Sequence, residues 1–359
     1  MSASTGSDSG VAAMVLDAAN RVFEGEITRE RMAQADRGIW QAQVWNAVED
    51  AGLPLALVPE RLGGVGLPIA QGLQLVRRAG YHTVPAPFAE TMLANLAWAE
   101  ASGASLPGPA TIGPVRPEDA LRIERDGGGY RLRGKAVRVP WVPHVRDVVL
   151  FARDASDAGF LVRLDGGASP GSQRNLANEP RDTLSWDATA VAADRVRPAP
   201  ALGSEGFLHL GALLRAQQMV GAMERCLDYA IAYAMERQQF GRPIAKFQAI
   251  QHMLADAAGQ FAAAAASADL AADAVGQPDF EFCAAVAKAR VGEACGKVAE
   301  VCHQVHGAMG FTQEHPLHFA TRRLWSWRDE FGHEAFWQER IGRLVCADGG
   351  DALWRRLVG

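Results

Sequence analysis

The sequence predicts an α+β fold with three domains: an N-terminal helical domain, a small β-barrel or β-sandwich, and a C-terminal four-helix bundle. Three observations predict this order. Apolar residues recur at helical spacing near the N-terminus, strand-like segments between Gly and Pro turns follow, and helical spacing then returns. The expected divisions are a disordered tail over 1–10, helices over 11–105, the β domain over 106–203 and the bundle over 204–359.

The first ten residues and the helical region after them differ in composition. The stretch MSASTGSDSG is small and polar and has neither the basic nor the apolar part of a signal peptide, so we expect a disordered tail. The stretch VAAMVLDAANRVF then places Val11, Met14 and Ala18 at helical spacing. Pro85 and Pro87 interrupt the helical pattern later in the same region.

Strand-like segments replace the helical pattern in the middle of the chain. YRLRGKAVRV, DVVLFAR and GFLVRL are short and rich in β-branched or aromatic residues. The turn-forming clusters RDGGG and DGGASPGS separate them. We therefore expect a small antiparallel β domain of about a hundred residues.

The helical pattern returns at Phe207 and continues for about six turns, with one apolar stripe made of Leu213, Ala216, Val220, Met223, Leu227, Ile231 and Ala234. Three further long helices are expected over about 246–275, 280–306 and 331–345, and Asp279 can cap the second of these. Four long helices with short connections predict an antiparallel bundle.

The bulk composition argues against several classes of protein. The chain has 359 residues, 48% hydrophobic and 21% charged, and its net charge of −5 argues against nucleic-acid binding. No stretch approaches the roughly 20 apolar residues that span a membrane. The five cysteines form no CxxC pair, which favours free thiols in a reducing cytoplasm, and no set of His and Cys residues completes a metal site.

Three long stretches carry recognisable motifs. RQQFGRPIAKFQAIQHMLADA begins at Arg237, where one expected helix ends and the next begins, and QVHGAMGFTQEHPLHFATRR begins at Gln304. WNAVEDAGLPLALVPERLGGVGLP lies in the N-terminal region. Together with the order of the domains, these motifs resemble the acyl-CoA dehydrogenase family along nearly the whole chain.

The resemblance implies an FAD cofactor that is held across a subunit interface. In this family the flavin ring lies against the β domain and bundle of one subunit, and the neighbouring subunit holds the ADP half through the two bundle motifs. The residues of this chain that match those motifs are the implied cofactor-binding residues, which we call the nucleotide clamp: Arg237, Phe240, Gln248, Gln304, Gly307 and Gly310.

The side chains of the nucleotide clamp suit a nucleotide. Arg237 can pair with a pyrophosphate through its planar fork of donors, Phe240 offers an apolar face to an adenine or ribose, and Gln248 supplies an amide. A glycine such as Gly307 lets backbone N–H groups approach a phosphate. Each residue also has an ordinary structural explanation, as a helix-terminal cation, a core ring or a helix cap. The family's second glycine is Ala308 here, whose methyl group narrows the space for a phosphate.

Other family motifs are missing from the middle of the chain. The family carries a Thr–Glu–Pro…Gly–Ser–Asp segment that binds flavin and lines the acyl-CoA site, and the matching stretch here contains no such motif. Arg138 stands where the family has the Trp of a Trp–Ile–Thr strand beside the flavin, and Pro140 stands near the hydroxyl position. Trp141 is close but out of register.

The general base of the family has no clear counterpart. α,β-Dehydrogenation removes an α-proton while a β-hydride moves to the flavin, so a carboxylate must lie beside Cα. Counting from Gly310 places Phe331 at the usual Glu position, one residue after Glu330, and the Glu position of another branch falls at about Gly211. Glu330 is the one candidate base, if the loop is shifted by a residue; the alternative is a solvated acid at a helix start.

A chain with the nucleotide clamp but without the ring contacts and the base resembles the degenerate β-type subunit of heteromeric α2β2 acyl-CoA dehydrogenases of actinobacterial steroid side-chain degradation. This resemblance implies a homologous catalytic subunit that contributes the base and most contacts to acyl-CoA, an electron-transferring flavoprotein as electron acceptor, and a cytoplasmic location. Two alternatives stay open: a self-sufficient homotetramer that uses Glu330, and a non-enzymatic scaffold without FAD.

Overall fold

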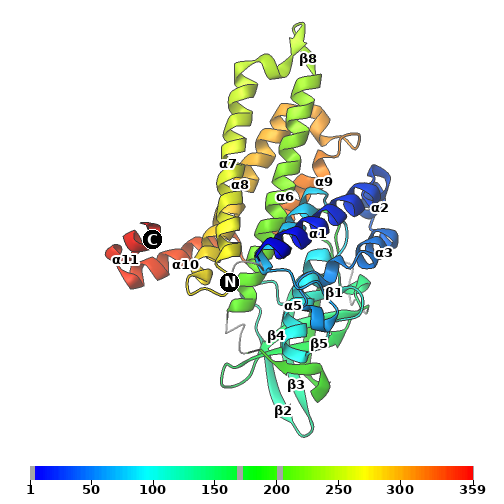
Figure 1. Cartoon of the computed structure of the whole chain (residues 1–359), viewed down its shortest axis with the longest axis vertical. Coiled ribbons are helices and arrows are strands. Elements are labelled where there is room, and N and C mark those ends of the chain that lie inside the picture. Colours follow the sequence, from blue (N-terminus) through cyan, green and yellow to red (C-terminus); the bar gives the residue numbers. More distant parts are fainter. Residues whose placement is uncertain (1–4, 168–172, 200–204, 359) are drawn as a thin grey trace.

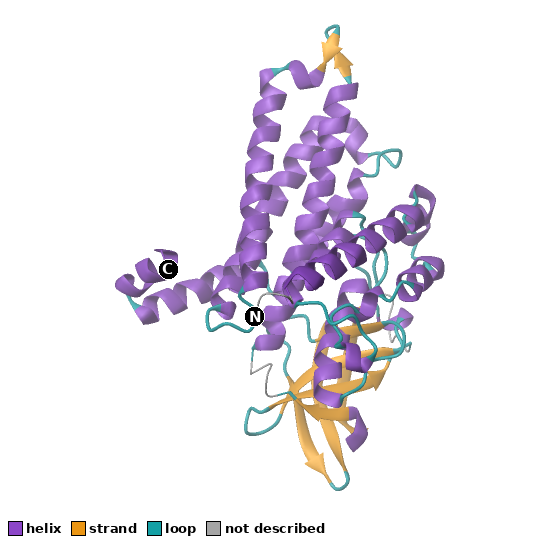
Figure 2. Ribbon diagram, in the orientation of Figure 1, coloured by secondary structure: helices purple, strands orange, loops and turns teal. Residues whose placement is uncertain are grey.

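The computed structural model describes residues 5–167, 173–199 and 205–358. The chain forms N-terminal helices, a β region and a long helical bundle that rises above the other two (Figure 1). Figure 2, coloured by secondary structure, separates the orange sheet from the purple helices. This arrangement confirms the predicted fold class. The expected boundary between the β domain and the bundle, at 203–204, lies outside the described residues.

The described N-terminal region consists of α-helices and two short 3₁₀ turns: α1 (Thr5–Glu26), α2 (Arg29–Asp36), α3 (Ala42–Asp50), η1 (Leu53–Leu55), η2 (Glu60–Leu62), α4 (Ile69–Tyr81) and α5 (Phe88–Ser102). The hydroxyl of Thr28 caps α2 by accepting a hydrogen bond from the N–H of Arg31. The prediction of a disordered tail is wrong for residues 5–10, because α1 begins at Thr5. Ser and Gly weaken a helix by about 1 kcal/mol or less per residue, so the strong helix formers that follow can extend it.

The β region is one seven-stranded sheet within the described chain, in the order β6-β3-β2-β4-β5-β7 with β1 beside β4. Its strands and 3₁₀ turns are β1 (Ala110–Gly113), β2 (Leu121–Asp126), β3 (Gly129–Pro140), η3 (Val142–His144), β4 (Asp147–Arg153), β5 (Gly159–Asp165), β6 (Arg181–Ala192), η4 (Ala193–Arg195) and β7 (Val196–Pro198). Most pairs are antiparallel, as expected, but β1 and β2 both run parallel to β4. The hydroxyl of Thr91 on α5 bonds both the N–H and the carbonyl of Ala110, which ties the sheet to the N-terminal helices.

An irregularity in β3 places one arginine outside the alternation of the strand. The register of β3 against β6 shifts between Ala136 and Val139. Arg138, inside this shift, has φ of 60°, and Trp141 just after the strand has φ of 59°. A β-bulge redirects the side chain of its extra residue, and such bulges are common next to binding sites.

The bundle consists of α6 (Gly206–Glu236), α7 (Gln248–Asp273), α8 (Phe280–His306) and α9 (Leu317–Trp327), with α6 in contact with the other three. The expected fourth helix over 331–345 is instead α10 (Glu334–Asp348), which extends sideways with α11 (Gly350–Val358) from the base of the bundle (Figure 1). The periodicity missed α9 because the helix is short and two of its arginines, Arg322 and Arg323, bind carboxylates of Asp36 and Glu179 rather than water.

Two glycines bring α4 and α6 close together. A Cβ on Gly80 would lie 1.9 Å from the carbonyl oxygen of Gln218, and a Cβ on Gly221 would lie 1.8 Å from the carbonyl oxygen of Arg77. Either methyl group would collide with backbone, so this separation of the helices requires glycine at both positions. The N-terminal helices are thereby held directly against the bundle.

The core of the bundle is made mainly of small apolar side chains. Ala, Val and Cys are frequent on the faces that α6, α7 and α8 share, and the free thiols of Cys226, Cys295 and Cys302 are buried there. Burial raises the pKa of Cys295 to about 11 and that of Cys302 to about 12, so both thiols stay protonated. No helix in the described ranges is long and apolar enough to cross a lipid bilayer.

Candidate functional site

The first part of the nucleotide clamp lies at the end of the bundle that is remote from the sheet, where α6 connects to α7 (Figure 1). The connection runs through β8 (Gln238–Gln239), β9 (Arg242–Pro243) and η6 (Ile244–Lys246). Phe240 and Gly241 form the turn between the two strands, with φ of 51° and 78°. The side chain of Phe240 is 92% exposed, so Phe240 is not part of the hydrophobic core. An aromatic ring held in water on a strained turn indicates a contact surface.

Arg237 and Gln248 flank this turn. The N–H of Arg237 donates to the carbonyl of Tyr233 and closes α6, and its carbonyl accepts from the N–H of Ile244. Among the described residues, the guanidinium group of Arg237 forms no hydrogen bond or ion pair. Gln248 begins α7 and is also exposed. Both side chains are therefore free to bind a group from outside the chain.

The second part of the clamp follows α8. Gln304 is exposed on the last turn of this helix, and η7 (Gly307–Phe311) begins at Gly307, which has φ of 59°. Nothing lies within 4 Å of the point where a Cβ on Gly307 would stand, so this glycine faces open space. A Cβ on Gly310 would lie 3.0 Å from Cβ of His306, so close packing already accounts for that glycine.

The two parts of the clamp meet at the same end of the bundle. The ring of Tyr233, one turn before Arg237, stacks on the ring of His306 with centroids 4.6 Å apart, and His306 directly precedes Gly307. Among the described residues, no hydrogen bond joins Arg237 to Gln304.

Histidines surround the second part of the clamp. The rings of His306 and His315 lie 4.3 Å apart between centroids. Burial and the nearby positive charges lower the pKa of His315 to about 4, so its ring is neutral near pH 7. Among the described side chains, Nδ1 of His303 and Nε2 of both His306 and His318 are buried without a hydrogen-bond partner. Unpaired ring nitrogens of this kind suit a polar ligand.

A cavity of about 780 Å³ lies between the sheet and the base of the bundle. The loop after β1, the bulge of β3, the segment before β6, the end of α9 and the start of α10 form its walls. The side chains that line it include Arg116, Arg138, Arg174, Trp325, Glu330 and Phe336.

Glu330 is engaged in ion pairs at the inner wall of this cavity. One carboxylate oxygen accepts from Nε of Arg181 at 2.6 Å, and the other accepts from Nε of Arg215 at 2.7 Å. Burial favours a higher pKa for Glu330, but the two guanidinium groups outweigh burial and hold its pKa below the ordinary value. The expected solvated acid is therefore wrong, since Glu330 is 6% exposed. A carboxylate with both oxygens occupied is a poor proton acceptor.

The ion pairs around this carboxylate continue into all three regions of the molecule. Arg215 on α6 also binds Glu90 on α5, and Arg181 on β6 binds Glu179 at 3.0 Å. Glu179 in turn pairs with Arg323 on α9 at 3.0 Å. The buried network is balanced in charge, because three guanidinium groups face three carboxylates: those of Arg181, Arg215 and Arg323, and those of Glu90, Glu179 and Glu330.

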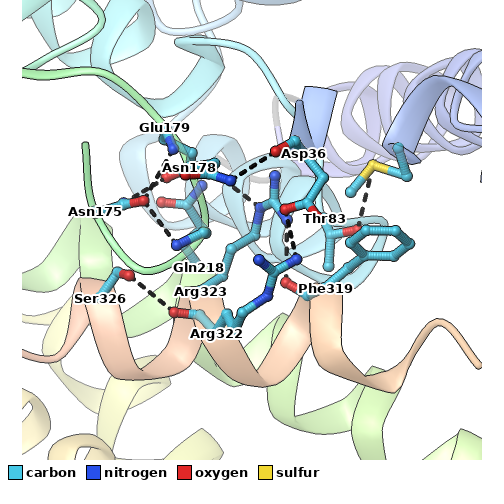
Figure 3. Close-up of polar contacts among 12 residues, drawn as sticks. Asp36, Thr83, Asn175, Asn178, Glu179, Gln218, Phe319, Arg322, Arg323 and Ser326 are labelled. Atoms are coloured by element: carbon cyan, nitrogen blue, oxygen red, sulfur yellow. Dashed lines mark hydrogen bonds and ion pairs between the residues drawn. The ribbon is translucent and has the colours of Figure 1, made fainter. Parts of the chain in front are cut away.

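Figure 3 shows how α9 is fastened to the other regions at the edge of this network. Arg322 donates to the carboxylate of Asp36 at 2.6 Å, and the amide of Asn178 donates to the backbone carbonyl of Asp36 at 2.7 Å. The amide of Asn175 donates to Glu179 at 3.0 Å. These contacts join the end of α2, the segment before β6 and α9.

Phe331 fills the space where the resemblance places a catalytic carboxylate. Its ring is fully buried against α6, where a Cβ on Gly211 would lie 2.3 Å from the ring. The N–H of Phe331 donates to the carbonyl of Val115 at 2.7 Å, and its carbonyl accepts from Nε1 of Trp337 at 2.9 Å. The two expected positions of the family's base thus contact each other, and they hold a phenyl ring and a glycine.

Lys288 holds the same loop from α8. Its buried ammonium donates to the carbonyls of Arg328 and Gly332 at 2.6 Å each, and burial lowers its pKa to about 7. The sequence analysis missed Arg181, Arg215 and Lys288. Arg215 is a single charge among apolar helical residues, and Lys288 lies in the largely apolar stretch CAAVAKARV, which was the available signal. Nothing in the sequence around Arg181 indicated its partners.

Comparison with known proteins agrees with this fold. A family model described as acyl-CoA dehydrogenase, C-terminal domain, matches residues 204–335. Acyl-CoA dehydrogenase IpdE2 of Mycobacterium tuberculosis is 29% identical over 290 residues, which cover 80% of this chain and 82% of that protein. The chain belongs to the acyl-CoA dehydrogenase family. The family's structural relatives are FAD-binding flavoproteins, so FAD is the family's cofactor.

Two solved structures share the fold across nearly the whole chain. A variant of the Tcur3481-Tcur3483 steroid ACAD matches with a TM-score of 0.84 and 22% identity, covering 95% of this chain and 99% of that chain. The ChsE4-ChsE5 complex from Mycobacterium tuberculosis matches with a TM-score of 0.82 and 24% identity, covering 93% of this chain and 96% of that chain.

The two halves of FAD fit this member of the family unequally. The ADP half fits the nucleotide clamp, where Arg237 is unpaired, Gly307 faces open space and buried ring nitrogens lack partners. The lining of the cavity departs from the ring contacts that the family resemblance implies. Arg138 projects from the strand where the family has a tryptophan, and the neighbouring loop lacks the family's flavin-binding motif.

Proposed function

We propose that the chain is the FAD-supporting subunit of a heteromeric acyl-CoA dehydrogenase, in which a homologous subunit holds the flavin ring and supplies the catalytic base. The contact between Phe331 and Gly211 carries this proposal, because it leaves both positions of the family's carboxylate apolar. Glu330, one residue earlier, is committed to Arg181 and Arg215. Neither position of the family's base therefore offers the α-proton an acceptor, and Glu330 beside them is already engaged.

The exposure of the nucleotide clamp supports a role toward a second subunit. Phe240, Arg237 and Gln248 are exposed at the end of the bundle that is remote from the cavity. This chain shares its fold with a chain of the ChsE4-ChsE5 complex, which is in keeping with an α2β2 assembly. The shared fold with a steroid ACAD favours a CoA thioester with a steroid side chain as the substrate. Electrons would pass to an electron-transferring flavoprotein in the cytoplasm.

Within this assembly the residues of the chain bind and orient one end of the cofactor. FAD, when bound, accepts the β-hydride of the CoA thioester. Arg237 neutralises the pyrophosphate, Phe240 covers the adenine or ribose, and the amides of Gln248 and Gln304 provide polar contacts. The backbone at Gly307 approaches the phosphates because no side chain intervenes. The chain itself moves no proton in the reaction.

Absorbance in the flavin bands tests the proposal, with the chain purified alone and after co-expression with a homologous partner. We expect no bound flavin in the isolated chain and stoichiometric FAD in the complex. Arg237→Ala should weaken FAD binding to the complex by about tenfold or more, since a charged hydrogen bond contributes roughly 1.5–3 kcal/mol. Arg343→Ala on the exposed surface of α10 is the matched control and should leave the FAD content unchanged.

Each alternative gives a different result in the same experiment. An isolated chain that is yellow and oxidises an acyl-CoA, and that loses this activity on Glu330→Gln while it keeps FAD, would establish the homotetramer. A complex whose FAD content is insensitive to Arg237→Ala would favour the scaffold instead.

A further inference from the structure

The cavity beside Glu330 has no role in the proposed function, although it is large and open. Its volume of about 780 Å³ lies within the range of small-molecule sites. Its walls come from the sheet and from α9 and α10, so it lies where separate parts of the fold meet. The residues that line it differ from those that would hold a flavin ring.

Arg138 is an unpaired cation in this cavity. It is exposed, and within the described part of the chain its guanidinium forms no hydrogen bond or ion pair. It sits on the bulge of β3 with φ of 60°, a conformation that is costly for a side chain other than glycine. Backbone strain of this kind is retained where the side chain serves a binding site. The bulge therefore holds a free positive charge at the cavity wall.

The remaining charges of the wall leave an excess of positive potential. Arg174 donates to the carbonyl of Asn178 at 2.7 Å and has no carboxylate partner among the described residues. Arg116 is paired with Glu118. In the described lining, Asp329 is the one carboxylate without an ion pair, because Glu330 is neutralised by its two arginines.

The start of α10 adds a further feature that attracts anions. Gly332 and His333 lie at the cavity wall, at the N-terminus of a helix of 15 residues. The N-terminus of a helix carries partial positive charge, which favours a negative group nearby. The helix start thus favours a bound anion in the cavity, as Arg138 and Arg174 do.

Aromatic rings provide an apolar surface in the same cavity. Trp325 is 42% exposed, and Phe336 lies at the wall in the first turn of α10. Flat rings in one cavity with arginines that lack a carboxylate partner match a ligand that joins a planar base to phosphates. An uncharged isoalloxazine ring would give these arginines no anionic partner.

We propose that this cavity binds a nucleotide phosphate, with the phosphates at Arg138 and Arg174 and the base against Trp325 and Phe336. The site is separate from the nucleotide clamp, which lies at the remote end of the bundle. It does not depend on the proposed function, since the cavity belongs to this chain whether or not a partner subunit is present.

Calorimetric titration with ADP tests the site on the purified chain and on its complex. Arg138→Gln should raise the dissociation constant for ADP at least tenfold, because the variant keeps a polar side chain but loses the charge. Arg116→Gln removes a cation that is already paired with Glu118, so it should change the dissociation constant for ADP less than threefold. FMN should bind the cavity more weakly than ADP.

A second variant separates this site from the nucleotide clamp, which would also accept ADP when FAD is absent. Arg237→Ala should leave the ADP binding that depends on Arg138 intact. Arg138→Lys keeps the charge and should bind ADP with an intermediate constant, which excludes loss of folding as the cause. The proposal is overturned if ADP binding responds to Arg237→Ala but not to Arg138→Gln, or if FMN binds more tightly than ADP.

Discussion

At the scale of single residues, Glu330 and Phe331 show how one position along a loop changes the chemistry of a family site. Phe331 turns toward α6 and covers Gly211, and Glu330 turns toward two arginines instead. Lys288 fixes this arrangement by donating hydrogen bonds to the backbone carbonyls of Arg328 and Gly332, which flank the two residues. A carboxylate in this setting stabilises the junction of the regions rather than accepting a proton.

Glu330→Gln should lower the free energy of unfolding by about 3–5 kcal/mol, because two buried guanidinium groups lose their shared negative charge. Denaturant unfolding followed by circular dichroism measures the change. Glu339→Gln removes an exposed ion pair with Arg343 and should cost less than about 1 kcal/mol. Equal effects of the two substitutions would contradict the role we assign to Glu330.

His82 makes stability depend on pH. Burial, and then the charges of Arg78 and Arg225, lower the pKa of His82 to about 4 from an ordinary 6.5. Between these values the unfolded chain binds the proton and the folded chain does not, so acidification from pH 6.5 to 4 lowers the free energy of unfolding. His82→Asn should flatten this decline, measured as urea midpoints across the window, and substitution of the exposed His252 should not. An unchanged slope in His82→Asn would refute the assignment.

At the scale of elements, α6 organises the molecule. It contacts α4, α7, α8 and α9, and it supplies Arg215 to the buried ion pairs and Gly211 to the pocket for Phe331. Its approach to α4 depends on Gly221 and on Gly80 opposite. The same helix ends at the nucleotide clamp, so its position links the two sites of the molecule.

Gly221→Ala tests this crossing. The new methyl group would meet the carbonyl of Arg77, and such overpacking costs roughly 1–3 kcal/mol or more, measured by thermal or denaturant unfolding. Gly259→Ala on α7 is the matched control: its Cβ meets nothing within 4 Å, so it should stabilise the helix by up to about 1 kcal/mol. A neutral Gly221→Ala would show that α4 and α6 can separate at little cost.

At the scale of the whole molecule, the exposed nucleotide clamp lies at the end of the bundle that is remote from the sheet (Figure 1), and the cavity lies between the sheet and the base of the bundle. The clamp presents unpaired groups to the outside, which suits the cofactor of a neighbouring subunit. The described walls of the cavity belong to this chain, and ion pairs that are balanced in charge separate it from α6. We infer that the chain has kept the outward half of the family's cofactor site and changed the chemistry of the inward half.

The sequence by itself determined the fold class, and it supplied the clamp residues as a prediction. Helical spacing, strand composition and turn residues are local properties, so they predicted the order of the regions, and the motifs at Arg237 and Gln304 are continuous stretches. Local patterns also misled where they were weak: residues 5–10 are helical, and the helix over 331–345 lies outside the bundle.

Only the tertiary structure decided the state of Glu330 and the existence of the cationic cavity. Glu90, Arg181 and Arg215 are far from Glu330 in the sequence, and the bulge at Arg138 depends on pairing with β6. The charge state and direction of a buried side chain depend on groups that the fold brings together, and no local pattern encodes those distances.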